Sequence, residues 1–230
     1  MKTTAELKAE AKNALRGKWK QAILLNLIPT LLIVSVFLFG VLSWTIWFFT
    51  HETDAAIVSA ISESIMDEGF LSLLSSIISA VFLSGISWTY LDLIRGERST
   101  IEPLKDVFRG FKGMFIGGVI LLSLLFNIFT SLWMILFLIP GVVKSYAYSQ
   151  CYFIYYDQIQ QTGKKPKALD TITASRQLMD GQKRRLFWLD ITFLGWYILS
   201  AVTFGIAYLW VAPYVSATRA AFYEDLQKNI

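Results

Sequence analysis

Four ionisable residues lie within or at the edge of long apolar stretches of the sequence. They are Lys144, Asp190, Asp92 and Arg219. A charge inside a bilayer is costly, so such residues are functional candidates by default. Together they could bind an anion or a lipid headgroup at a site open to the cytoplasm. The alternative is structural: a buried polar network that fixes helix register, or cationic side chains that extend to the membrane surface.

Lys144 lies far from either end of its apolar stretch. A charge that loses its partner in a low-dielectric setting is strongly destabilising. We therefore expect Lys144 to form an ion pair with Asp190, with Asp92 as the second choice of partner.

Prolines close to two of these charges predict helix breaks. Pro140 and Gly141 precede Lys144, and Pro213 precedes Arg219. A proline inside a helix removes one backbone hydrogen bond and frees a carbonyl group. The sequence therefore predicts breaks at Pro140–Gly141 and at Pro213.

Other catalytic or metal-binding patterns are missing from the sequence. Cys151 is the single cysteine, which excludes an internal disulfide and a cysteine metal cluster, and His51 is the single histidine. There is no Walker loop, zinc-binding helix or dinucleotide fingerprint. Asp180-Gly181 with Arg184 faintly resembles the phosphatidyl-alcohol transferases but lacks their further aspartates, so a helix end is the better interpretation. We expect no enzyme, no catalytic residue, no cofactor and no metal.

The elements that must position the four charges are membrane helices. Hydrophobic residues make up 55% of the 230 residues and charged residues 17%, and residues 21–50, 69–91 and 113–143 carry no charge. A membrane-spanning helix needs about 20 apolar residues. The composition predicts an all-α, polytopic membrane protein with a single domain over residues 1–230. Its six transmembrane helices in three hairpins are expected at 22–49, 70–91, 114–130, 132–156, 186–203 and 205–223.

The charge pattern predicts the orientation of these helices. With six spans, every basic segment outside the helices falls on one side, and the segment 51–68 on the other side holds acidic residues and no lysine or arginine. Positive charge is typical of cytoplasmic loops, so both termini are expected in the cytoplasm of a multi-pass plasma-membrane protein. The rule also accounts for the net charge of +4 without nucleic acid as a partner. Residues 54–68 are expected to form a short acidic helix on the outer surface, closed by Gly69.

A cytoplasmic amphipathic helix is expected before each hairpin. The first starts at Thr3, which has capping-box spacing to Glu6. The second starts at 99 or 100, with Pro103 in its first turn, and the third starts near Pro166 and ends at Gly181. We favour the interpretation that these basic helices lie on anionic lipid headgroups. The alternative is docking of an unidentified cytoplasmic protein partner or specific binding of a lipid headgroup.

The C-terminal half carries a recognisable order of motifs: Ile139-Pro140-Gly141-Val142-Val143-Lys144, then Ser175-Arg176-Gln177-Leu178-Met179-Asp180-Gly181, then Trp210-Val211-Ala212-Pro213-Tyr214. This order resembles the bacterial integral membrane family called domain of unknown function 975 (DUF975), which is common in Gram-positive bacteria. The resemblance implies a multi-span plasma-membrane protein, distantly similar to membrane domains that accompany glycerophosphodiester phosphodiesterases. It implies no particular activity.

Two classes of function follow from the sequence. The first is a non-catalytic membrane protein that acts through lipid or protein contacts, as an accessory or envelope component. The second is a small transporter for an anionic or lipid-like substrate, with its charged site around Lys144. A continuous polar cavity reaching past Lys144 would favour the transporter.

Overall fold

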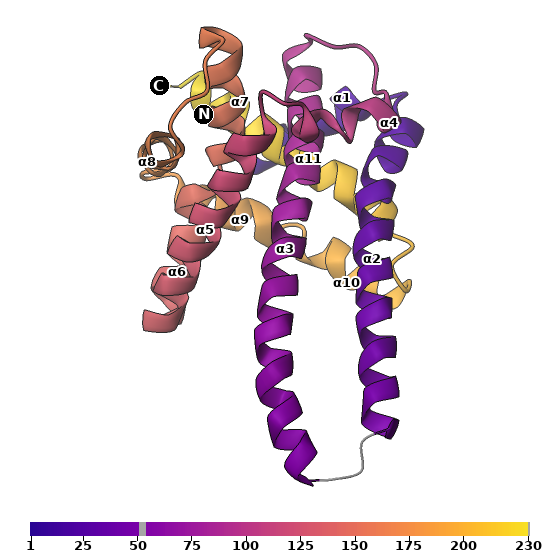
Figure 1. Ribbon diagram of the computed structural model, residues 1–230. Helices are drawn as coiled ribbons and strands as arrows, with labels where there is room; N and C mark the ends of the chain where they lie inside the picture. The colour runs from indigo at the N-terminus through magenta and orange to yellow at the C-terminus, as the bar shows by residue number, and fades with distance from the viewer. Residues whose placement is uncertain (51–53, 230) are drawn as a thin grey trace.

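The computed structural model describes residues 1–50 and 54–229, and within these ranges the chain is all α-helical with no strand (Figure 1). Figure 1 places both termini at one end of the molecule, near α1, α4 and α7. The elements in chain order are α1 (Thr4–Leu15), α2 (Trp19–Thr50), α3 (Asp54–Arg95), α4 (Pro103–Asp106), the 3₁₀-helix η1 (Arg109–Phe111), α5 (Ile116–Leu136), α6 (Leu138–Tyr148), α7 (Cys151–Thr162), α8 (Ala168–Leu178), α9 (Lys183–Ile191), α10 (Leu194–Val202) and α11 (Tyr208–Gln227).

The first hairpin, formed by α2 and α3, is longer than the sequence predicts. α2 has 32 residues and α3 has 42, which at 1.5 Å per residue gives about 48 and 63 Å. The expected separate outer helix at 54–68 is wrong, because α3 runs from Asp54 to Arg95 without interruption at Gly69. Figure 1 shows this hairpin extending well beyond the other helices.

The second hairpin turns later than expected. α5 continues to Leu136, and the turn lies at Phe137, whose backbone is extended. Pro140 lies in the first turn of α6, where its missing N–H has no helical partner to lose. The expected break at Pro140–Gly141 is therefore wrong, and the chain is interrupted just before the proline's helix begins.

A second interruption divides the expected span 132–156. α6 ends at Tyr148 and α7 begins at Cys151. The backbone N–H of Gln150 donates to Ser175 Oγ of α8, 3.2 Å away. A contact with a distant helix thus takes the place of a helical hydrogen bond at this position, which the local sequence does not signal.

In the third hairpin, α9 and α10 form the first arm and α11 forms the second. The turn before α11 contains Phe204 and Gly205, both with positive φ, close to where the sequence places it. The expected break at Pro213 is wrong, because α11 is continuous from Tyr208 to Gln227 with the proline inside it. In Figure 1, α9 and α10 run across the direction of α3.

Among the fully described residues, three stretches are long and apolar enough to cross a membrane: Ser72–Arg95, Ile116–Leu136 and Lys183–Val202. Large apolar side chains are also exposed on several helices, for example Phe39 at 72% and Ile135 at 82%. Exposed apolar surface on this scale marks an interaction site or a membrane surface. The fold is thus compatible with a membrane protein, and six spans go beyond what these three stretches show.

The core lies near the two termini. We call this core the terminal layer. It comprises α1, α4, η1, α7 and α8 together with the last turns of α3 (88–95) and of α11 (217–227). α11 packs against α1, α2, α3 and α10. Leu7, Ala11 and Leu15 of α1 are at most 1% exposed. The apolar face of the first amphipathic helix therefore contacts the chain itself.

The three expected amphipathic helices differ in how they form. The capping box at the start of α1 is present, with the backbone N–H of Thr3 donating to Glu6 Oε2 over 2.6 Å. The second helix is reduced to α4, whose N-cap is Glu102 and not residue 99 or 100. The third forms α8, and Gly181 has a φ of +71° after it.

Candidate functional site

Ion pairs between helices are the main polar feature of the terminal layer. Arg95, at the end of α3, contacts Asp157 of α7 through both terminal nitrogens, at 2.7 and 2.8 Å. Its Nε donates to Glu224 of α11 over 2.7 Å. Tyr223 adds a hydrogen bond to Asp157 Oδ2 of 2.7 Å. One guanidinium group therefore joins three helices in the two-pronged geometry that makes arginine–carboxylate pairs strong.

A second set of pairs surrounds Asp92, which is one of the four sequence candidates. Arg109 Nη2 lies 2.8 Å from Asp92 Oδ2, and the same guanidinium donates to Tyr156 and Thr89. Tyr156 Oη donates to the other carboxylate oxygen of Asp92 over 2.9 Å. The ring of Tyr156 stacks on Trp88 with a centroid distance of 5.1 Å. These contacts hold η1 and α7 against α3.

The structure pairs Asp190 with Arg219 and not with Lys144. Arg219 Nη2 is 3.0 Å from Asp190 Oδ2, and Tyr146 donates to the same carboxylate over 3.2 Å. Lys144 Nζ lies over the ring of Trp133, 4.7 Å from its centroid. The expected Lys144–Asp190 ion pair is wrong, because α11 brings a guanidinium to Asp190 and α5 offers Lys144 an aromatic face. The four candidates therefore belong to three separate contacts.

The two chain ends join the same layer. Arg185 of α9 pairs with Asp225 of α11, which also accepts from the backbone N–H of Lys2 at 3.1 and 3.2 Å. The amino terminus donates to Asn229 Oδ1 over 3.2 Å. The N-terminal segment is thereby held against the C-terminal helix.

These contacts keep the charged groups of the terminal layer ionised. Burial raises the pKa of Glu224, but the hydrogen bond and charge of Arg95 outweigh it, so its pKa lies below the ordinary value. Asp225 has a lowered pKa as well, because Arg185 and the N–H of Lys2 outweigh its burial. Burial opposes the charge of Arg109, yet Asp92 raises the pKa of this guanidinium above its ordinary value.

Sequence reasoning assigned Arg95, Arg109 and Arg185 only to the positive-inside pattern and did not consider Glu224 and Asp225. One signal could have found them. In the sequence these two carboxylates lie between Arg219 and Lys228, just after the sixth expected span, and a carboxylate among basic residues at a helix end is expected to pair with one of them. Which arginine it meets depends on the packing of α3, α9 and α11.

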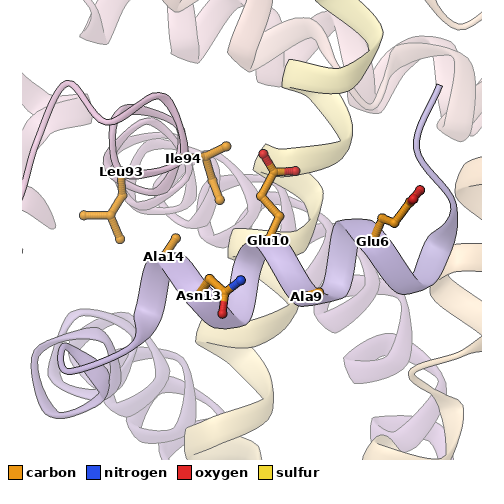
Figure 2. A pocket seen from close by; sticks show the side chains of 7 residues that line it. All are labelled: Glu6, Ala9, Glu10, Asn13, Ala14, Leu93 and Ile94. Atoms are coloured by element: carbon orange, nitrogen blue, oxygen red, sulfur yellow. The ribbon is translucent and has the colours of Figure 1, made fainter.

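Two cavities lie in the terminal layer. One, of about 460 Å³, lies between α1 and the end of α3 and is lined by Glu6, Glu10, Asn13, Leu93 and Ile94, among others (Figure 2). The other, of about 550 Å³, lies between α7, α8 and α11. Its lining includes Asp157, Gln158, Gln161, Gln177, Tyr223 and Gln227. Neither is lined by any of the four sequence candidates.

Within the described ranges, no group of three histidine, cysteine or carboxylate side chains could hold a metal ion. The buried carboxylates Asp92 and Asp157 instead accept hydrogen bonds from arginine and tyrosine. Groups held in this way join helices to one another.

The fold and its charged contacts define an all-α protein with helices compatible with membrane insertion and an ion-paired terminal layer. A family model described as "Protein of unknown function (DUF975)" matches residues 1–145 and 134–230. The chain therefore belongs to the DUF975 family, as its motifs suggest. No curated protein and no solved structure matches it.

Proposed function

We propose that this protein is a non-catalytic, multi-pass protein of the bacterial plasma membrane that acts through lipid or protein contacts, as an accessory or envelope component. The observation that carries the proposal is that ion-paired charges and exposed apolar side chains lie in different parts of the molecule. In the terminal layer, Asp92, Asp157 and Glu224 are each bound by an arginine, which makes the layer a fixed surface. The helices beyond it expose apolar side chains. This arrangement suits a protein that is anchored in the membrane by its apolar helices. Its fixed terminal layer would then contact lipids or other proteins.

The proposal includes six spans with both termini in the cytoplasm. The spans lie within α2, α3, α5, α6 with the start of α7, α9 with α10, and α11, and the last turns of α3 and α11 lie outside the membrane in the terminal layer. Figure 1 supports a common side for the two termini, because both of them and the connection between α7 and α8 lie at the end opposite to where α2 ends and α3 begins. The span formed by α9 and α10, which run across the direction of α3, is proposed on the sequence pattern alone. The connection between α7 and α8 contains Lys164, Lys165 and Lys167, which the positive-inside rule assigns to the cytoplasm.

Cysteine labelling tests this topology. Single cysteines replace Ser59, Ser99 or Lys164 in a Cys151→Ala background, since Cys151 is buried. A membrane-impermeant thiol reagent applied to intact cells should label the Ser59→Cys protein alone. All three should label after the cells are opened. Labelling of Lys164→Cys in intact cells would contradict the six-span topology.

A second experiment separates the contact role from the transporter. A transporter with its site at Lys144 needs a water-filled path to that residue, so a charged thiol reagent should reach Lys144→Cys from the cytoplasmic side. The contact role predicts no reaction within the time in which Ser99→Cys reacts completely in inside-out vesicles. Rapid reaction of Lys144→Cys would favour the transporter.

A further inference from the structure

The start of α5 lies at the level of lipid headgroups if the protein spans the membrane as proposed. α5 has 21 residues, Ile116–Leu136, which gives a length of about 31 Å. The hydrocarbon core of a bilayer is about 30 Å thick. The helix therefore fills the apolar layer completely, and the residues just before it, from Lys112 on, are placed among the headgroups.

Two basic segments distant in sequence meet at this level. Lys165, in the connection between α7 and α8, donates from Nζ to the backbone carbonyl of Gly113 over 3.3 Å. The side chains of Lys112, Lys164 and Lys167 are exposed. Among the described residues, none of these four lysines lies within ion-pair distance of a carboxylate, in contrast to the arginines of the terminal layer. Their positive charge is therefore free for an external anion.

The first turn of α5 adds polar groups to the same place. No side chain caps this helix start. The N–H groups of Phe115 and Ile116 donate to the carbonyl of Lys112, so the partial positive charge of this turn comes from the N–H groups that follow them. A side chain at Gly117 would meet nothing within 4 Å, so the turn is open on that side. The hydroxyl of Tyr155 is fully buried against Gly118 and has no hydrogen-bond partner in the described part of the chain. An unpaired buried hydroxyl is unusual, so the Tyr155 hydroxyl leaves this helix end with an unsatisfied polar group.

From this juxtaposition we propose that Lys112, Lys164, Lys165 and Lys167, with the first turn of α5, form a binding site for the phosphate headgroup of an anionic phospholipid. The proposal rests on the proposed membrane function and names the lipid class and the place of contact. The lysines supply the charge that distinguishes an anionic lipid from a zwitterionic one. The helix start supplies N–H groups for the phosphate oxygens.

Native mass spectrometry of the full-length protein in mild detergent tests the site. The probes are dioleoylphosphatidylglycerol and dioleoylphosphatidylcholine, each titrated separately. The wild type should bind the anionic lipid with the lower Kd. Each lysine near an anionic surface changes the Kd about fivefold. Lys112→Gln with Lys165→Gln should therefore raise the Kd for the anionic lipid about tenfold or more and leave the Kd for the zwitterionic lipid unchanged.

The matched control is Lys12→Gln with Arg176→Gln, which removes the same charge from exposed positions on α1 and α8, two helices whose apolar faces pack inside the molecule and do not lie open to lipid in the way that the sequence predicts. This control should bind both lipids as the wild type does. A second variant, Gly117→Asp, places a carboxylate at the helix start in open space and should also lose the preference for the anionic lipid without losing thermal stability.

Three results would overturn the proposal: equal Kd values of the wild type for the two lipids, equal weakening by the test and control pairs, or displacement of the lipid by millimolar inorganic phosphate. The last result would identify a free-phosphate site. Failure of the lipid preference leaves the topology labelling unaffected, whereas rapid reaction of Lys144→Cys contradicts the contact role without changing the lipid result. The two failures are therefore distinguishable.

Discussion

The two ends of the α2–α3 hairpin differ in what surrounds them. At the end near the termini, Leu25 and Asn26 of α2 are buried, and Asn26 Nδ2 donates to Tyr90 Oη of α3 over 2.6 Å. Farther along α2, Leu38 is 59% and Phe39 is 72% exposed. The chain itself therefore holds the first part of the hairpin in place. The second part presents apolar side chains to its surroundings.

This difference indicates two sources of stability in one molecule. The terminal layer resembles the core of a soluble protein, because it has buried aromatic residues such as Trp88 and Tyr223 and ion pairs between helices. In the hairpin arm (residues 31–50 and 54–80), none of the side chains that the structure describes is buried, and in α5 the described side chains beyond Ser123 are at least partly exposed. Both segments therefore depend on an apolar environment. Substitutions in the layer should therefore change stability in any detergent, whereas matched substitutions in the arm should change it little.

The largest effect is expected for Arg109→Met. This change leaves Asp92, with a side chain only 4% exposed, as a buried charge without its cation, and such losses typically cost about 3–5 kcal/mol. Thermal unfolding in mild detergent measures the loss. Adding Asp92→Asn removes the stranded charge and should recover part of it.

The matched substitution in the arm is Thr45→Val, which removes a hydroxyl that bonds only within its own helix. The midpoint temperature of its thermal unfolding should stay close to that of the wild type. An Arg109→Met protein as stable as Thr45→Val would show that the pair with Asp92 contributes nothing to the terminal layer.

A pair of glycine substitutions sharpens the comparison with an identical chemical change. A Cβ atom on Gly110 of η1 would lie 2.1 Å from the backbone carbonyl oxygen of Val81 in α3, so Gly110→Ala must force η1 away from α3. Overpacking of this kind costs about 1–3 kcal/mol. Gly40 of α2 has nothing within 4 Å of the same position, and Gly40→Ala should raise stability by about 0.5–1 kcal/mol. Equal effects of the two variants in thermal unfolding would contradict the division into layer and arm.

A smaller loss of thermal stability is expected at low pH, and it should come from carboxyl groups of the terminal layer. Glu224 and Asp225 have folded-state pKa values below their ordinary values of 4.5 and 3.8. The stabilisation from a lowered carboxyl pKa is complete above the ordinary value and is lost as pH falls through the folded value. Thermal stability should therefore be constant from about pH 7 to 5 and fall below about pH 4.5.

The variant Glu224→Gln with Asp225→Asn isolates these two groups from other carboxyls. It should be less stable than the wild type at neutral pH, and the difference should shrink on acidification. A difference that stays constant down to about pH 3 would show that neither carboxyl titrates with a lowered pKa.

How far the sequence predicts the fold depends on whether the signal is local. The capping box at Thr3 and Glu6 and the turn at Gly205 are local, and both are present. The turn of the second hairpin is displaced to Phe137, because residues 113–143 carry no charge and the polar Asn127, near which the turn was expected, lies inside α5 and donates to the carbonyl of Ser123. The expected break at Pro140 fails because this proline lies in the first turn of α6, where the missing N–H is tolerated. Pro213 lies inside α11, and the helix continues through it to Gln227.

The candidate site follows the same rule. The sequence identifies which charges lie among apolar residues, but not which partner each charge meets. Arg95 contacts Asp157 and Glu224, which are distant from it in sequence, and only the packing of α3, α7 and α11 brings them together. The choice of Arg219 over Lys144 as the partner of Asp190 likewise depends on how α9 and α11 pack.

The smallest effect should come from Lys144, and it tests which partner Asp190 has. A pair between Lys144 and Asp190 would make Lys144→Met sharply destabilising, with recovery on adding Asp190→Asn. The structure instead gives Lys144 an aromatic contact with Trp133, which contributes about 0.5–1 kcal/mol. Thermal unfolding of Lys144→Met should show a loss of that size, and its combination with Asp190→Asn should be additive. Arg219→Met and Asp190→Asn should be non-additive, because their side chains are 3.0 Å apart. Coupling in the lysine cycle and additivity in the arginine cycle would reverse the pairing, and Asp190 would then pair with the cation of α6 instead of the cation of α11.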